Sequence, residues 1–200
     1  MRKKVLTSIF STTLTLTLLS GCAGPSTTAN TAEMTSSSIN TTKKNTTQAS
    51  EKPKAIINFK STTVENEPIT SEIFKDYKIT MINIWATWCG PCLAEMPDLS
   101  KLQDELPEGS NLISFILDAG DDEETRQTAL DYIAEFNLKY ISVIPDISIA
   151  KFVNSNITGI PTTIFVDKEG NIVGDLMLGA PRGDIVKGYQ KAIEERIDML

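Results

Sequence analysis

An α/β fold with a mixed β-sheet is the fold class that the sequence predicts for residues 55–200. From about residue 55 to 153, short runs of apolar and β-forming residues alternate with segments whose apolar residues recur at helical spacing. Two further short runs joined by a turn, and a final amphipathic segment, close the chain. This order is typical of a sheet covered by helices. The length of the region suits a single domain.

The N-terminal part of this region predicts a hairpin, then a buried strand and a helix. Residues 55–59 and 67–70 are expected to form the two strands of the hairpin. Residues 80–85, TMINIW, are a short apolar run rich in β-formers and are expected to form a central strand. Pro91 suits the first turn of the helix that follows, and helical spacing of apolar residues continues down to Pro107.

The remaining elements continue the alternation toward the C-terminus. Apolar runs predict the strands, and apolar residues at helical spacing predict the helices. A four-residue turn, DKEG, joins the last two strands. The expected elements are a strand at 111–118, a helix at 123–136, a strand at 140–144, a short helix at 147–153, strands at 162–166 and 171–177, and a closing helix from about residue 183.

The first 21 residues are typical of a bacterial export signal. Three basic residues at positions 2–4 precede an apolar run at 5–19 that is too short to span a bilayer comfortably. The run ends in Leu-Ser-Gly-Cys, which resembles the lipobox of bacterial lipoproteins. This resemblance implies cleavage before Cys22 and attachment of lipid to it, and such a cysteine carries enough acyl chains for stable anchoring. The alternative is an ordinary secretory signal with an incidental cysteine.

Residues 22–54 are expected to be a disordered tether between lipid and domain. Ser, Thr and Asn dominate this stretch, which has no aromatic residue and almost no apolar one. It cannot bury enough surface to offset the entropy lost on ordering. A flexible coil of this length has an end-to-end distance of roughly 30 Å. The predicted regions are therefore a signal peptide at 1–21, the tether at 22–54 and one domain at 55–200.

Charge distinguishes the domain from proteins that bind nucleic acid or membrane surfaces. Of 19 basic and 26 acidic side chains, seven basic and two acidic ones precede residue 55, which leaves 12 basic and 24 acidic ones and a formal charge of −12. An acidic surface disfavours nucleic acid and electrostatic binding to anionic lipid. The acidic residues 121–124 are expected to be a solvated helix start, favoured by the helix dipole, rather than a cation site.

Three cysteines and the lack of histidine restrict the chemistry. With Cys22 assigned to lipid, Cys89 and Cys92 remain, in the stretch WATWCGPCLAEMP. A structural zinc site needs four ligands, usually Cys or His, and a Ser-His-Asp or Cys-His hydrolase needs a histidine, so these are disfavoured. A static disulfide remains open, although closing so small a loop stabilises a protein little. No metal or other cofactor is expected.

The position of the cysteine pair favours redox chemistry. Cys89 is expected just before a helix and Cys92 in its first turn, where backbone N–H groups and the helix dipole favour a thiolate. The thiol pKa should therefore fall below its free value, which is what a nucleophilic cysteine needs at neutral pH.

Two motifs resemble the thioredoxin superfamily. WATWCGPC is similar to the active site of that family, and GIPT at residues 159–162 is similar to its second signature. The resemblance implies a thioredoxin-like fold over residues 55–200, a redox-active disulfide between Cys89 and Cys92, and a cis Pro161 lying against it. From the residues alone, GIPT could also be a turn with a trans bond, the commoner state. The resemblance further implies that substrate contacts Trp88, Gly90, Pro91, Ile160 and Pro161.

Three positions narrow the resemblance to the exported, membrane-anchored thiol-disulfide oxidoreductases of the TlpA/ResA-like group. Thioredoxin has an aspartate six residues before its first active-site cysteine, where this chain has Asn83. Glu95 and Pro97 complete a CxxCxxExP pattern. In that group the glutamate tunes thiol acidity and helps to move protons, which implies a catalytic role for Glu95. The alternative for Glu95 is a solvated carboxylate on the helix surface.

The resemblance implies an extracytoplasmic, lipid-anchored reductase of protein disulfides, since Gly90-Pro91 is the dipeptide of reducing thioredoxins. Compatible substrates are apocytochrome c, methionine sulfoxide reductases and misoxidised exported proteins. The chain has no nicotinamide or flavin fingerprint, so a membrane protein of the CcdA/DsbD type is expected to donate electrons. The domain is expected to be a monomer. Two alternatives stay open: a disulfide-forming oxidase of the same fold, and a noncatalytic lipoprotein that uses the fold only for binding.

Overall fold

A computed structural model describes residues 56–200 of the chain, so the expected signal peptide, Cys22 and the tether lie outside the described residues. Within these residues, seven strands form one sheet in the order β2-β1-β5-β4-β3-β6-β7. The strands are β1 Lys60–Thr63, β2 Pro68–Thr70, β3 Ile79–Trp85, β4 Ser110–Ile116, β5 Ile141–Ile144, β6 Thr162–Asp167 and β7 Met177–Leu178. The helices are the 3₁₀ helix η1 Ser71–Asp76 and the α-helices α1 Gly90–Leu102, α2 Glu123–Glu135, α3 Ile147–Asn156 and α4 Ile185–Ile197.

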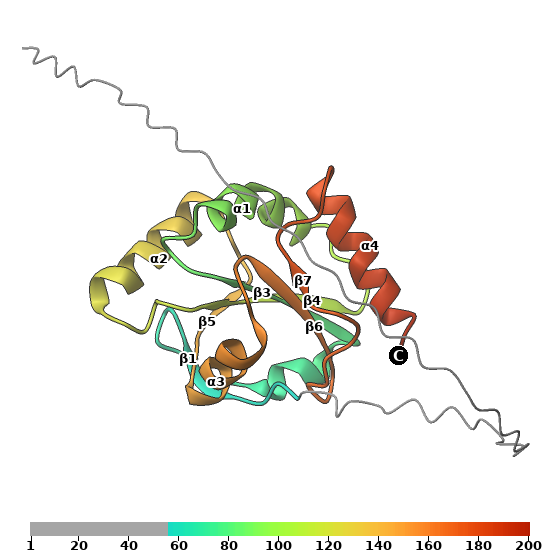
Figure 1. The fold of residues 1–200 in the computed structure, drawn as a ribbon, viewed down its shortest axis with the longest axis horizontal. Helices are drawn as coiled ribbons and strands as arrows, with labels where there is room; N and C mark the ends of the chain where they lie inside the picture. Colours follow the sequence, from blue (N-terminus) through green and yellow to red (C-terminus); the bar gives the residue numbers. More distant parts are fainter. Residues whose placement is uncertain (1–55) are drawn as a thin grey trace, which may run out of the picture. The chain divides into compact units, whose positions relative to one another are not determined.

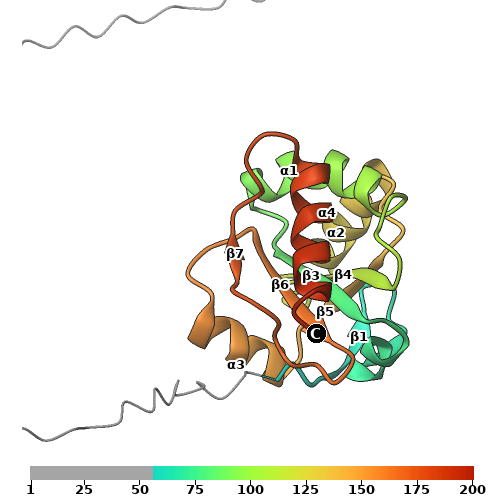
Figure 2. The same ribbon diagram turned by 90° about the vertical axis from the view of Figure 1, so that its right-hand side faces the viewer.

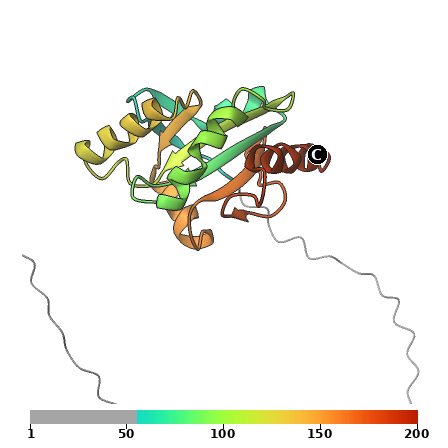
Figure 3. The same ribbon diagram turned by 90° about the horizontal axis from the view of Figure 1, so that it is seen from above.

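The helices cover both faces of the sheet. Helices α2, α1 and α4 lie in that order across one face, and α3 lies on the other (Figure 1). Side chains show the same division: Phe74 of η1 and Ile149 of α3 pack with Ile82 and Ile84 of β3, whereas α1 and α4 pack with the opposite face of β3. The views from the side (Figure 2) and from above (Figure 3) show α4 beside α1 over the strands. None of the helices within residues 56–200 is long and apolar enough to cross a membrane.

Strand directions confirm the predicted mixed sheet. Strand β3 runs parallel to β4, and β4 runs parallel to β5. The other neighbours, including β3 with β6 and β1 with β5, are antiparallel. The predicted N-terminal hairpin is present as the antiparallel pair of β1 and β2. All seven residues of β3 are buried, as expected for the central strand TMINIW.

The first expected strand, residues 55–59, is wrong in position. Residue 55 lies outside the described residues, and hairpin pairing begins only at Lys60. The preceding segment crosses to the turn after β6 instead, where the N–H of Ile57 donates to the carbonyl of Gly170 at 2.8 Å. The side chains of Ile57 and Phe59 are buried in the core on the α3 face. Their alternation therefore reflects burial and not membership of the hairpin.

The expected strand at residues 171–177 is also wrong as a continuous element. Ile172 forms only an isolated bridge to Val166, and regular pairing with β6 resumes in β7 at Met177. The interruption has a backbone cause, because Gly174 has a φ of +71° and so turns the chain out of the extended conformation.

The acidic residues 121–124 form the predicted solvated helix start. Asp122 caps α2, and its Oδ1 accepts the N–H of Thr125 at 2.7 Å. Glu123 pairs with Arg126 one turn later. These contacts, together with the helix dipole, stabilise the acidic side chains at the N-terminus of α2.

Candidate redox site

The two cysteines lie where β3 passes into α1, and they form a disulfide. Cys89 is the N-cap of α1, and its Sγ accepts the N–H of Cys92 at 3.3 Å. Pro91 occupies the first turn, where a missing N–H costs nothing. Cys89 is 3% exposed and Cys92 1%. The predicted placement of the pair at a strand-to-helix junction is confirmed.

A buried carboxylate holds the loop that carries the dithiol. Asp118, just after β4, is 7% exposed. Its oxygens accept the N–H of Thr87 at 3.0 and 3.1 Å and the hydroxyl of Thr87 at 2.6 Å. Thr87 lies two residues before Cys89, so Asp118 fixes the backbone from which the cysteine projects. Sequence reasoning did not identify this residue.

The second signature lies at the same end of β3 as the dithiol. The peptide bond between Ile160 and Pro161 is cis, as the resemblance implied. Strand β6 begins at the next residue, Thr162, which pairs with Ile84 near the end of β3. Ile160 packs against the apolar cluster that contains both cysteines. The chain therefore brings GIPT and CGPC together from sequence positions about 70 residues apart.

The rim of the site is exposed and partly apolar. The side chain of Trp88 is 73% exposed, whereas Trp85 is fully buried. Gly90 and Pro91 are exposed as well, and Ile160 is half-buried. These rim residues are four of the five that the sequence assigns to substrate contact. The fifth, Pro161, is buried.

Glu95 is not on the helix surface, and the alternative of a solvated carboxylate is therefore excluded. Its side chain is 1% exposed. The amide nitrogen Nδ2 of Asn83 donates to Oε1 of Glu95 at 2.8 Å, and the hydroxyl of Tyr189 donates to Oε2 at 3.0 Å. Burial raises the pKa of Glu95, the hydrogen bonds from Asn83 and Tyr189 lower it in part, and the charge of Asp98 raises it further.

Comparison with known proteins decides the family. A family model described as Redoxin matches residues 40–193. The chain belongs to the Redoxin family. It is 28% identical over 138 residues to the thiol-disulfide oxidoreductase ResA of Bacillus cereus (strain ZK / E33L), which covers 68% of this chain and 75% of the relative. It is 27% identical over 143 residues to the thioredoxin-like protein YneN of Bacillus subtilis (strain 168), with 70% and 75% covered.

Solved structures show the same fold. A thiol:disulfide interchange protein of the thioredoxin family from Chlorobium tepidum TLS has a TM-score of 0.60 and 23% identity, with 74% of this chain and 99% of the other covered. StoA from Bacillus subtilis has a TM-score of 0.54 and 22% identity, with 70% and 98% covered. The predicted thioredoxin-like fold is thus confirmed. This Redoxin-family chain is a thioredoxin-like thiol-disulfide oxidoreductase of the TlpA/ResA-like type.

Glu95 lies over a row of small polar side chains that crosses the sheet. Asn83 pairs with Thr163 of β6 on one side and with Ser114 of β4 on the other, and Ser114 pairs with Ser142 of β5. All four are at most 1% exposed. Each stands out in the sequence as a polar residue within an apolar strand. We name this set, Thr163, Asn83, Ser114 and Ser142, the polar row.

Tyr189 is a second site residue, after Asp118, that sequence reasoning missed. The helical spacing of Ile185, Tyr189 and Ile193 predicts only that it lies on the apolar face of the closing helix. In the structure it is fully buried, and its hydroxyl lies 3.2 Å from Oγ1 of Thr163 as well as contacting Glu95. A tyrosine among aliphatic residues on a buried face needs a partner for its hydroxyl. The sequence therefore indicates that the Tyr189 hydroxyl has a hydrogen-bond partner, but it does not identify that partner.

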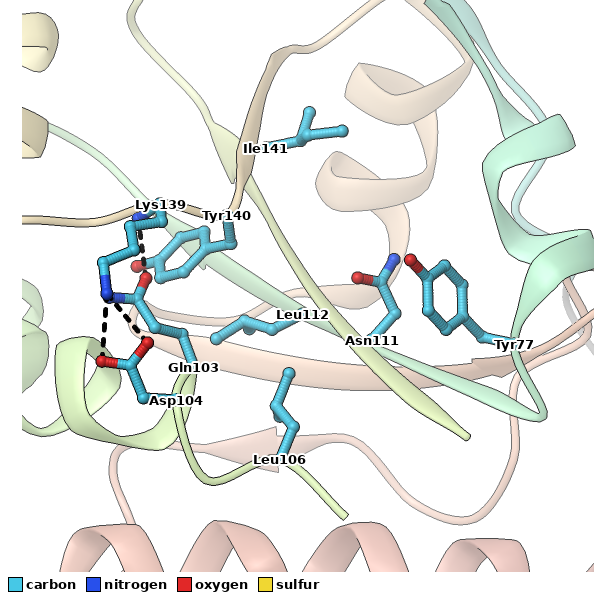
Figure 4. Close-up of a pocket in the computed structure, with 9 residues that line it drawn as sticks. All are labelled: Tyr77, Gln103, Asp104, Leu106, Asn111, Leu112, Lys139, Tyr140 and Ile141. Carbon is cyan, nitrogen blue, oxygen red and sulfur yellow. Dashed lines mark hydrogen bonds and ion pairs between the residues drawn. The ribbon is translucent and has the colours of Figure 1, made fainter. Parts of the chain in front are cut away.

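A cavity of about 300 Å³ is lined by Gln103, the C-cap of α1, and so lies at the opposite end of that helix from the dithiol. Figure 4 shows the residues that line it. Beside it, Lys139 pairs with Asp104 at 2.9 Å, and its backbone N–H donates to Oε1 of Gln103 at 2.7 Å. Tyr140 also lines the cavity. The pKa of its hydroxyl is raised mainly by burial and, to a smaller extent, by the charge of Glu95. None of the predicted site residues lines this cavity.

Within residues 56–200, no cluster of three or more Cys, Asp or Glu is arranged to hold a metal ion.

Replacing Asp118 tests whether the loop clamp matters for the reaction. In Asp118→Ala, the N–H and hydroxyl of Thr87 lose their acceptor. We expect the free energy of unfolding to fall by about 1–3 kcal/mol, as for other buried groups left unsatisfied. We also expect slower reduction of insulin disulfides, because Cys89 loses its fixed position. The matched control is Asp121→Ala, which removes an exposed carboxylate. Equal behaviour of the two variants in urea unfolding and in turnover would contradict this role.

Proposed function

We propose that this chain is a lipid-anchored reductase that acts outside the cytoplasm on disulfides of exported proteins, through Cys89 and Cys92. The observation that carries the proposal is the Cys89–Cys92 disulfide at the N-terminus of α1, between an exposed tryptophan and the cis Pro161 segment. A capping cysteine that accepts a backbone N–H is placed to be stabilised as a thiolate. Cys89 is the N-cap of α1 and is the nucleophile in this proposal.

The first half of the reaction forms a mixed disulfide. The thiolate of reduced Cys89 attacks one sulfur of the substrate disulfide and forms a bond to it. The other substrate sulfur leaves as a thiolate and takes up a proton from water. Trp88, Gly90, Pro91 and Ile160 border the point of attack and contact the substrate chain in this proposal.

The second half releases the substrate. The thiol of Cys92 gives its proton to the carboxylate of Glu95, one helical turn further along α1, and the resulting thiolate attacks Sγ of Cys89. The Cys89–Cys92 disulfide forms, the remaining substrate sulfur leaves as a thiolate, and it takes up a proton. Two electrons have passed from the dithiol to the substrate. Glu95 is thus the proposed proton acceptor.

Sequence features outside the described residues support the proposed cellular location, at the outer face of the cytoplasmic membrane. The lipobox-like segment before Cys22 supports lipid attachment, and the tether at 22–54 supports reach toward a membrane partner. A thiol carrier of the CcdA/DsbD type would return two electrons to the Cys89–Cys92 disulfide. Apocytochrome c, methionine sulfoxide reductases and misoxidised exported proteins are the proposed substrates.

The reduction potential tests the direction of the reaction. We expect the Cys89–Cys92 couple to have a potential near that of thioredoxin, roughly −270 mV, because Gly90-Pro91 is the dipeptide of the reducing enzymes. The measurement is the fraction of full-length chain that resists thiol alkylation after equilibration in defined thiol–disulfide buffers. A potential near that of the oxidase DsbA, roughly −120 mV, would overturn the reductase and favour the oxidase alternative.

A further inference from the structure

The buried carboxyl of Glu95 and the buried hydroxyl of Tyr189 meet the polar row at Asn83 and Thr163. The hydroxyl of Tyr189 in α4 lies 3.0 Å from Oε2 of Glu95 in α1 and 3.2 Å from Oγ1 of Thr163 in β6. Thr163 and Asn83 are paired across neighbouring strands, and Asn83 holds the other oxygen of Glu95. All four are at most 1% exposed. These contacts connect the C-terminal helix, the strand that follows Pro161 and the glutamate beside the dithiol.

We propose that Glu95, Tyr189 and Thr163 form a hydrogen-bond chain whose direction reverses when Glu95 takes up a proton, which makes Tyr189 and Thr163 positioning residues for the reaction. This inference rests on the proposed function, in which Glu95 accepts the proton of Cys92. It assigns a role to two residues from outside the CxxC and cis-proline motifs.

The direction of the chain with ionised Glu95 follows from counting protons. A carboxylate only accepts hydrogen bonds, so Tyr189 donates its single hydroxyl proton to Oε2. Tyr189 then has no proton left for Thr163. The hydroxyl of Thr163 must therefore donate to the oxygen of Tyr189, a direction that their 3.2 Å separation permits.

The direction with protonated Glu95 is the opposite. Nδ2 of Asn83 can only donate, so Oε1 of Glu95 remains an acceptor and the proton resides on Oε2. Oε2 then donates to the oxygen of Tyr189, and Tyr189 turns its own proton toward Thr163. All three contacts remain hydrogen bonds in both protonation states, and no heavy atom has to move.

Keeping these hydrogen bonds in both protonation states matters because Glu95 is buried. A buried carboxyl without partners is strongly disfavoured in its ionised form, and a neutral one without an acceptor leaves its proton unsatisfied. The chain lowers the cost of both forms, so Glu95 can take up and release a proton inside the core. Besides Cys92, whose proton Glu95 accepts in the proposed function, the other titratable groups near Glu95 are Asp98 on its own helix and the hydroxyl of Tyr140. That hydroxyl has no hydrogen-bond partner within residues 56–200.

The test is the titration of Glu95 in the full-length chain with ¹³C-labelled glutamate carboxyls, followed by NMR and assigned by loss of the signal in Glu95→Gln. In Tyr189→Phe the ionised form loses a hydrogen bond to a charged group, and the neutral form loses only a weaker, neutral one, so we expect the midpoint to rise by about one pH unit. Thr163→Val is expected to raise it by less, because it weakens the Tyr189 bond without removing it. Thr163→Ser keeps the hydroxyl and is expected to restore the wild-type midpoint.

An unchanged midpoint in folded Tyr189→Phe would overturn the proposal, as would a Thr163→Ser midpoint shifted as far as that of Thr163→Val. If Tyr189→Phe does not fold, the comparison of the two Thr163 variants decides alone. The titration needs no turnover, so it is separate from the proposed function. A chain that titrates as expected but reduces no disulfide would contradict the reductase and leave the hydrogen-bond chain standing.

Discussion

Cys89→Ser is expected to abolish reduction of insulin disulfides while leaving the fold intact. A serine hydroxyl does not attack disulfides at neutral pH, because the nucleophile in the exchange is a thiolate. Serine is nevertheless a favoured N-cap, so the start of α1 keeps a cap where Cys89 now accepts the N–H of Cys92. The measurement is insulin turbidity in the presence of a chemical reductant, with urea unfolding of the reduced proteins to confirm equal folding.

Cys92→Ala is the counterpart that separates the two halves of the reaction. Attack by Cys89 should still occur, but no thiol remains to release the substrate, so a mixed disulfide is expected to accumulate. It would be detected as a species of higher mass that a reductant dissociates, and its partner identified by mass spectrometry. Accumulation in Cys89→Ser instead would reverse the assigned roles. A noncatalytic binding protein would capture its partner equally well in both variants and without a covalent bond.

Local signals were sufficient to predict the position of the dithiol. The apolar run TMINIW predicts a buried strand without reference to the rest of the chain, and Pro91 marks the start of a helix within the next turn. The segment between them has room only for a short loop, so Cys89 and Cys92 had to lie at the junction. The start of α2 at residues 121–124 was predictable for the same reason, since a cap and its helix are neighbours in sequence.

The environment of Glu95 could not be predicted in this way, because its partners are remote in sequence. Tyr189 is 94 residues away, and a helical pattern shows which face is buried but not which side chain it meets. Glu95 also adjoins Met96 at the edge of an apolar face, where a carboxylate can turn either inward or outward. The break at Gly174 was hidden for a different reason, since glycine permits a positive φ without requiring it.

Glu95→Gln is expected to slow the second half of the reaction on the order of a hundredfold, within the range of general base catalysis. Glutamine has nearly the same shape and can keep the contacts with Asn83 and Tyr189, but it cannot accept the proton of Cys92. Formation of the mixed disulfide by Cys89 should change much less. Rapid mixing with a disulfide substrate, quenched by acid and separated by mass, measures both steps. Equal slowing of both steps would show that Glu95 supports the fold of the site and is not its proton acceptor.

The same variant tests the raised pKa of Glu95 through stability. Because the pKa in the folded state lies above the usual value of 4.5, the folded protein holds the proton more tightly than the unfolded chain. The stabilisation from this proton is complete below the unfolded pKa and is lost as the pH rises through the folded pKa. Glutamine does not titrate, so Glu95→Gln should gain stability relative to wild type over that pH range, by about 1.4 kcal/mol for each pH unit between the two pKa values.

Urea unfolding of the oxidised proteins at a series of pH values from 4 to 8 measures this difference, and Glu124→Gln, at an exposed position of α2, is the matched control. The control should follow wild type throughout. A Glu95→Gln curve parallel to wild type would mean that the carboxyl has the same pKa in both states. Burial and the bonds from Asn83 and Tyr189 would then cancel, and Glu95 would be ionised throughout the neutral range. A gain that continues toward pH 8 would instead place the folded pKa close to neutrality, where a base that exchanges protons with a thiol is most effective.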